Sequence, residues 1–116
     1  MHLDMLGRDE ARDEAARRAA ALASEVLAGS VGLIEGARTL WRLGSYIVQD
    51  TALDKDFVVL VGFDDETDHL PVGAERSNWD PVALMGKDRE IAEYEEMWGP
   101  KVRAACQSIV ARFGAA

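Results

Sequence analysis

Four carboxylates and one imidazole lie within six consecutive residues, Asp64 to His69, directly after the most apolar segment of the chain. Oxygen and imidazole groups hold divalent metal ions, and a carboxylate next to an imidazole can transfer protons during hydrolysis. One hypothesis is therefore a metal-binding domain or a small metal-dependent enzyme. Its centre would comprise Asp64, Glu66, Asp68 and His69.

The spacing of these carboxylates resembles that of an EF-hand-type calcium loop only in part. Asp64, Glu66, Asp68 and Glu75 fall at positions 1, 3, 5 and 12 of such a loop. Position 6 requires glycine for a sharp turn but holds His69. The apolar segment before the cluster is also a poor entering helix. The sequence therefore disfavours a specific calcium site.

Other kinds of catalytic site find little support in the residue types present. The chain offers only His2, His69 and Cys106 as nitrogen and sulfur ligands, from widely separated positions. Cys106 lies on the expected buried face of a helix, where thiols are usually inert. We find no phosphate-binding loop, cofactor motif or complete metal motif. We therefore predict no catalytic residue, no metal ligand and no cofactor.

A structural interpretation of the cluster competes with the chemical ones. Asp and Thr side chains accept hydrogen bonds from backbone amides in tight turns, so the cluster can anchor the chain where it leaves the core. Arg76 would return to pair with Asp68 or Glu66, and Trp79 would cover the junction. The residues of this predicted structural turn are Thr67, Asp68, His69 and Arg76.

The negative charge of the chain is concentrated in its middle. The net charge is −8 overall, with −1 in residues 1–49, −10 in residues 50–96 and +3 in residues 97–116. A section at −10 repels nucleic acid and anionic lipid and attracts a basic surface. We therefore predict no nucleic-acid partner, no membrane partner and a basic protein partner.

An acidic protein surface with an aromatic anchor is typical of a charge-steered interface. The alternative is an acidic surface that serves solubility alone. The predicted partner-binding residues are Asp64, Asp65, Glu66, Glu75, Trp79, Glu93 and Glu96. Trp41 and Trp98 add large apolar surface, with which a homodimer is also compatible.

The elements that position these groups are mostly helices. A chain of 116 residues with 48% apolar residues fits a single globular domain, 1–116. Apolar residues recur at helical spacing in four segments, and glycine or proline punctuates them. We expect helices over 8–28, from 31 or 32 to about 46, from Asp80-Pro81 to Gly99, and from Pro100 to Phe113.

The apolar segment Phe57–Phe63 is ambiguous, because periodicity cannot separate a buried strand from a buried helix when every residue is apolar. As a strand it would pair with His69–Val72, although Pro71 would confine that partner to a sheet edge. The predicted fold class is therefore mainly α. We expect a compact bundle of about four helices, with either a short β-hairpin or an extended excursion at 57–72.

Two strings resemble a group of short bacterial proteins of uncharacterised function. They are Glu35-Gly-Ala-Arg38 and Gly62-x-Asp-x-Glu-Thr-Asp-His-Leu-Pro-x-Gly73, followed by Arg76, Trp79 and Ala83-Leu84. The resemblance covers the central half to two-thirds of the chain. It implies a bacterial origin and no particular activity.

These observations favour a binding protein over an enzyme. A single cysteine, no apolar N-terminal block and no apolar run near ~20 residues predict a cytoplasmic location. In size and acidity the chain is similar to immunity proteins and other small acidic inhibitors. We therefore predict a non-enzymatic cytoplasmic binding module whose acidic central section engages a basic protein partner, with an inhibitor or immunity protein as one form of it.

Overall fold

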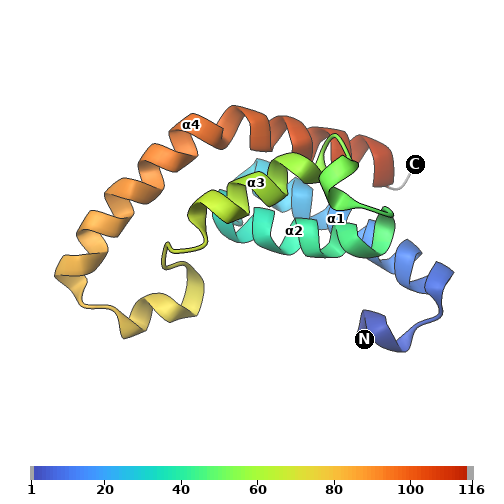
Figure 1. The fold of residues 1–116 in the computed structure, drawn as a ribbon, viewed down its shortest axis with the longest axis horizontal. Coiled ribbons are helices and arrows are strands. Elements are labelled where there is room, and N and C mark those ends of the chain that lie inside the picture. The colour runs from blue at the N-terminus through green and yellow to red at the C-terminus, as the bar shows by residue number, and fades with distance from the viewer. Residues whose placement is uncertain (1, 115–116) are drawn as a thin grey trace.

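The computed structural model describes residues 2–114, which fold into helices without a strand (Figure 1). Residues 1, 115 and 116, which the predicted domain 1–116 includes, lie outside the described part. The four main helices are α1 (Arg8–Ala28), α2 (Leu33–Ile47), α3 (Phe57–Thr67) and α4 (Pro81–Phe113). Short 3-10 helices are η1 (Leu3–Met5), η2 (Thr51–Leu53) and η3 (Gly73–Asn78). The prediction of a compact, mainly α bundle of four helices is confirmed.

The core lies where α1, α2 and α3 meet the second half of α4. α1 contributes a face of small side chains, mostly alanines, which lets its neighbours approach closely. α3 supplies the largest fully buried side chains, Phe57 and Phe63. α4 contributes Val102, Cys106 and Ile109. α1 therefore packs its small side chains against α2 and α4, and α3 packs its larger side chains against the same two helices.

α3 resolves the ambiguity of the apolar segment in favour of a helix. Its buried residues Phe57, Leu60, Phe63 and Thr67 are three or four positions apart, as one face of a helix requires. The intervening apolar residues hid this period in the sequence. No strand forms within residues 2–114, so the hairpin considered for 57–72 is wrong, and the extended excursion is wrong over Phe57–Thr67. The neighbouring elements α2, α4 and η2 cover the segment on more than one side, so it does not need a continuous polar face.

α4 continues through Gly99-Pro100, where we expected one helix to end and another to begin. Asp80 caps its start as predicted, accepting a hydrogen bond from the Ala83 amide, with Pro81 in the first turn. Pro100 removes one helical hydrogen bond and favours a bend, and Figure 1 shows α4 changing direction along its length. The predicted stop is wrong because packing on both sides of Pro100 holds the helix together.

Two glycines of α2, Gly36 and Gly44, let neighbouring helices approach closely. A Cβ on Gly44 would lie 2.6 Å from the ring of Phe57, and one on Gly36 would collide with Val26 of α1. The helix bounds expected for α2 agree within two residues. Gly29 ends α1 in the left-handed conformation, with φ of 83°.

The first half of α4 projects from the bundle together with the segment before it (Figure 1). We call residues 72–98 the arm. None of them is buried. The arm extends beyond the compact bundle, and the described chain measures 47 × 29 × 25 Å. Aromatic contacts join the arm to the bundle, including Trp98 against Phe63 with ring centroids 5.6 Å apart. None of the described helices combines the length and hydropathy needed to cross a bilayer.

Candidate functional site: the acidic segment and the arm

The acidic cluster begins inside α3, and its first carboxylate faces the core. Asp64 is only 9% exposed. Its Oδ1 accepts a hydrogen bond from Nε of Arg38 at 2.9 Å, and its Oδ2 accepts one from Nε1 of Trp41 at 2.6 Å. Both donors come from α2. A predicted partner-binding residue thus ties α3 to α2 from within, and Asp64 is not part of the exposed acidic surface.

The end of α3 is held by the same guanidinium group. Nη2 of Arg38 donates to the backbone carbonyl of Thr67. A cation at a helix C-terminus satisfies a carbonyl that has no partner in the helix. The Thr67 hydroxyl, fully buried, donates to the Phe63 carbonyl at 2.6 Å. Arg38 therefore fixes both the carboxylate of Asp64 and the last turn of the helix.

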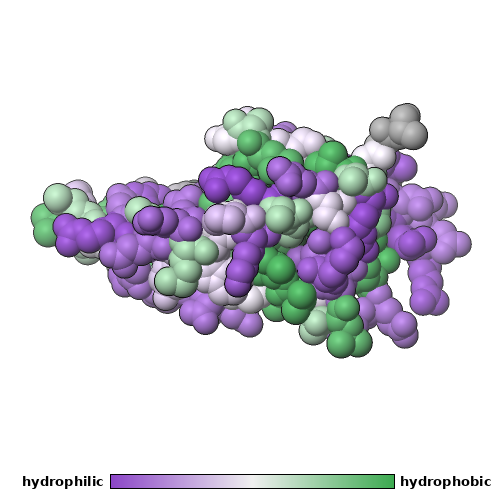
Figure 2. Space-filling model, turned by 90° about the horizontal axis from the view of Figure 1, so that it is seen from above, coloured by the Kyte–Doolittle hydropathy of each residue, from purple (hydrophilic) through white to green (hydrophobic). Residues whose placement is uncertain are grey.

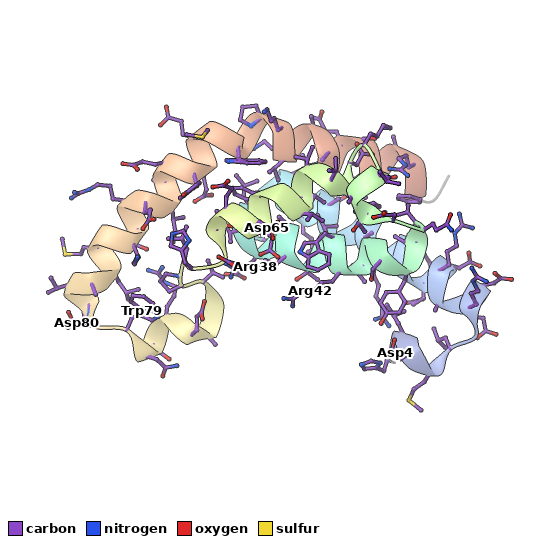
Figure 3. The ribbon with its side chains drawn as sticks, viewed as in Figure 1. Asp4, Arg38, Arg42, Asp65, Trp79 and Asp80 are labelled. Atoms are coloured by element: carbon purple, nitrogen blue, oxygen red, sulfur yellow. The ribbon has the colours of Figure 1, made fainter. Side chains whose placement is uncertain are left out.

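The helix separates the remaining members of the cluster. Asp65, Glu66 and Asp68 are exposed, whereas Asp64 points inward, because consecutive residues lie on different sides of a helix. Figure 3 labels Asp65 on α3 and Arg38 on α2. Within residues 2–114, no group of three or more His, Cys, Asp and Glu side chains is arranged to hold a metal ion. The four ligands hypothesised for a metal centre are thus not brought together.

His69 pairs with the arm instead. Its Nε2 lies 2.7 Å from Oε1 of Glu90, and its ring meets the ring of Tyr94 edge-on. The hydrogen bond with the His69 imidazole is the main cause of the lowered pKa of Glu90, and Lys87 lowers this pKa further. Asp68, at the end of α3, is exposed. His69 therefore connects the end of α3 to the first half of α4.

Arg76 lies in η3, and its partner differs from the expected ones. It donates to Asp88 of α4 and to the backbone carbonyl of Pro71, rather than to Asp68 or Glu66. Arg76 lowers the pKa of Asp88. Trp79 lies near the free end of the arm, away from Asp65 and Arg38, so it does not cover the junction (Figure 3).

The two strings singled out in the sequence, Glu35–Arg38 and Gly62–Gly73, meet in space. Arg38 of the first string binds Asp64 and the carbonyl of Thr67 in the second. Gly73 has φ of 64°, and a Cβ there would lie 3.7 Å from the carboxylate of Glu35. The strings therefore encode a single contact region between α2 and the segment that leads into the arm.

The other predicted partner-binding residues are on the surface. Asp65, Glu66, Glu75, Glu93 and Glu96 are all exposed. Only Glu75 has a hydrogen bond within the described chain, accepted from the Val72 amide. Residues 64–98 contain eleven acidic residues against three basic ones, a net charge of −8. This section alone carries as much negative charge as the whole chain.

A cavity of about 180 Å³ opens where the arm meets the start of α2. Its lining is partly apolar, from Leu33, Val72 and Ile91, and partly charged, from Glu35, Glu95 and the Arg76–Asp88 ion pair. Three carboxylates against one guanidinium leave the lining net negative and disfavour an anion, and the apolar side chains favour the stem of a long side chain. The cavity is therefore suited to a cationic group with an aliphatic stem.

A second cluster of charged side chains was not predicted from the sequence. Asp54 and Asp56 precede α3 and bind Arg112 at the far end of α4, with N–O distances of 2.8 Å. Asp54 also accepts hydrogen bonds from the amides of Asp56 and Phe57 at the start of α3. Arg112 holds the pKa of Asp54 at about 2. The signal available in the sequence was two aspartates just before an apolar helix, which is typical of capping.

This second cluster contains a serine and a lysine, but its bonding is structural. The Ser108 hydroxyl donates to Asp56 at 2.6 Å and accepts from Lys55 at 2.7 Å. These bonds lie beside the Arg112 ion pairs and join the start of α3 to the second half of α4. We assign the cluster to stability.

Cys106 is buried, as predicted, and burial raises the pKa of its thiol to about 11. A thiol that stays protonated at neutral pH is a poor nucleophile. Cys106 is therefore a core residue.

Comparison with known proteins adds no assignment to this geometry. No family model, no curated protein and no solved structure matches the chain significantly.

Proposed function

We propose that this protein is a non-enzymatic, cytoplasmic binding module whose acidic section, residues 64–98, engages a basic protein partner. The observation that carries the proposal is a set of carboxylates that the fold leaves exposed and uses for nothing else. They are Asp65, Glu66, Asp68, Glu93 and Glu96.

These carboxylates differ from the acidic residues that hold the fold together. Asp54, Asp56 and Asp64 each bind an arginine and contact the core helices. The side chains of the exposed set make no hydrogen bond or ion pair with the described residues. Concentrated charge of one sign repels itself and destabilises the compact state, so its presence favours a role outside folding.

The negative charge of residues 64–98 determines which class of partner this section attracts. Carboxylates repel phosphates, which makes nucleic acid and anionic lipid surfaces poor partners. A basic protein is attracted from a distance and is oriented by the field before contact. An inhibitor or immunity protein directed against a basic target is one form of such a module.

Charge reversal tests the proposal. The variant Asp65→Lys/Glu66→Lys/Glu93→Lys/Glu96→Lys changes only exposed residues without ion-pair partners in the described chain. We expect proteins captured from the native host on the wild-type chain to be lost on this variant, and capture to weaken steeply with salt. The readout is mass spectrometry of the captured proteins, repeated at low and high ionic strength.

The matched control makes the same charge change on α1, with Asp9→Lys/Glu10→Lys/Asp13→Lys/Glu25→Lys. All four of its residues are exposed and lie outside the acidic section. We expect the control to retain the captured partner, with circular dichroism confirming that both variants fold. Equal capture by the wild type and the arm variant would contradict the proposal.

A further inference from the structure

The first half of α4 exposes apolar side chains on the side that faces away from the bundle. Val82, Met85 and Met97 are 73%, 68% and 71% exposed. Figure 2 shows hydrophobic side chains at the free end of the arm, at the left edge, separated by a largely hydrophilic stretch from the hydrophobic surface over the bundle. The fold does not require apolar residues at these positions.

Helical spacing places these residues on one face together with charged ones. We call this surface the outer face; along the helix it comprises Val82, Met85, Arg89, Glu93, Glu96 and Met97. Steps of three and four residues lead from Val82 to Glu93 and on to either Glu96 or Met97, which keeps all six on one side. The side chains of Arg89, Glu93 and Glu96 make no hydrogen bond or ion pair with the described residues. The outer face spans about 23 Å along the helix axis.

The inner side of the same helix holds the arm to the bundle. Ile91, Tyr94 and Trp98 pack partly against the core, and Lys87 and Glu90 form an ion pair beside His69. The contacts that hold the arm to the bundle therefore leave the outer face uncovered. It is an unpartnered helix face with two apolar residues at its free end, carboxylates along its stem and a third apolar residue near the bundle.

We infer that the outer face docks an amphipathic helix of the basic partner, an inference that rests on the proposed function. Charge complementarity selects this occupant: lysine or arginine side chains pair with Glu93 and Glu96, and aliphatic side chains cover Val82, Met85 and Met97. A helix suits the site because side chains of one helix fill the grooves of another. Arg89 is the one base on the face and opposes the partner's charge.

Synthetic peptides of defined chemistry test the inference without knowledge of the natural partner. The probe is a fluorescein-labelled leucine–lysine peptide of about 18 residues, long enough to form a helix with its leucines on one face. Two controls have the same length: a scrambled peptide of identical composition and an oligolysine. Fluorescence anisotropy measures binding to the full chain at low salt. We expect the amphipathic peptide to bind more tightly than either control.

Two variants separate apolar contact from charge. Val82→Ser/Met85→Ser should weaken binding of the amphipathic peptide about tenfold and leave oligolysine binding unchanged. Arg89→Glu should strengthen binding of all three peptides about threefold, because it removes a repulsive base and adds a carboxylate. Neither variant alters a core contact, so the fold should be retained.

The outcomes distinguish this inference from the proposed function. If the amphipathic and scrambled peptides bind equally and the serine variant changes neither, the inference is overturned while acidic attraction stands. If no peptide binds at low salt, the proposed function fails as well. Light scattering of the chain alone adds a third outcome: a dimer that the serine variant converts to a monomer would assign the outer face to a second copy and overturn the inference.

Discussion

The two halves of α4 belong to one helix but lie in different environments. Every buried residue of α4 lies from Gly99 onward, in the half that packs in the bundle, and none lies in the half that forms the arm. The bundle half contributes Cys106 and Ile109 to the core, whereas the arm half exposes Val82 and Met85. A continuous helix therefore does not imply continuous packing. Substitutions in the bundle half should affect stability, and substitutions on the outer face should affect binding.

The largest expected difference between the halves comes from truncating apolar side chains. Ile109→Ala leaves a cavity in the core and should lower the free energy of unfolding by about 2–5 kcal/mol. Val82→Ala removes a solvated side chain and should change it by less than about 0.5 kcal/mol. Urea denaturation measures both. Equal costs would mean that the arm is packed as tightly as the bundle.

Breaking an ion pair should also cost more stability in the bundle than in the arm. Arg38→Met leaves Asp64 partly buried without its cation, at an expected cost of about 2–3 kcal/mol. Arg76→Met in the arm breaks the more exposed pair with Asp88 and should cost under about 1 kcal/mol.

A double variant isolates the cause of the larger cost. Asp64→Asn removes the negative charge but keeps an acceptor for the Trp41 indole. Arg38→Met/Asp64→Asn should therefore be more stable than Arg38→Met alone in chemical denaturation. If it is less stable, the cost comes from lost packing of the arginine stem and not from the unpaired carboxylate.

Replacing glycine by alanine should destabilise the protein in the bundle and stabilise it in the arm. Gly44→Ala in the bundle forces a Cβ against the fully buried ring of Phe57 and should cost about 1–3 kcal/mol. Gly86→Ala in the arm meets nothing within 4 Å and should gain about 0.5–1 kcal/mol from helix propensity. Thermal unfolding by circular dichroism distinguishes them, and a destabilised Gly86 variant would indicate a contact on the exposed arm.

Acid sensitivity should originate in the bundle. The pKa of Asp54 is depressed from 3.8 to about 2, chiefly by its hydrogen bonds with Arg112. The resulting stability is fully present well above pH 3.8 and is lost as the pH falls through about 2, an effect of about 2 kcal/mol.

The check compares the unfolding free energy at pH 5 and pH 2 for the wild type, Asp54→Asn and Asp88→Asn. Asp54→Asn should show a clearly smaller loss at low pH than the wild type. Asp88 also has a lowered pKa but is exposed in the arm, so Asp88→Asn should flatten the pH dependence less than Asp54→Asn does. A larger flattening for Asp88→Asn than for Asp54→Asn would place the acid-sensitive contact in the arm.

Local signals predicted some boundaries and failed at others for identifiable reasons. Gly29 ends α1 and Asp80-Pro81 starts α4, as expected, because each acts on its own turn of backbone. Gly99-Pro100 carries an equally strong local signal, yet the helix continues there. Trp98 packs on Phe63 before the proline and Val102 is buried after it, so tertiary contacts stabilise the helix across the break.

The candidate site was likewise predicted only in part. The sequence predicted an acidic section, and the structure places Asp65, Glu66, Glu93 and Glu96 of that section on the surface. It could not distinguish Asp64, because a carboxylate becomes structural only when a particular arginine reaches it. Arg38 lies 26 positions earlier in the chain, and no local pattern records that pairing.

By itself, the sequence determined that the chain is helical and where its negative charge is concentrated, since both follow from composition and from spacings of three or four residues. Only the tertiary structure decided that Phe57–Thr67 is a helix, that Asp64 is bound from within and that the outer face of α4 is free. These three facts depend on which helices lie side by side, and contacts between distant segments leave no periodic signal in the sequence.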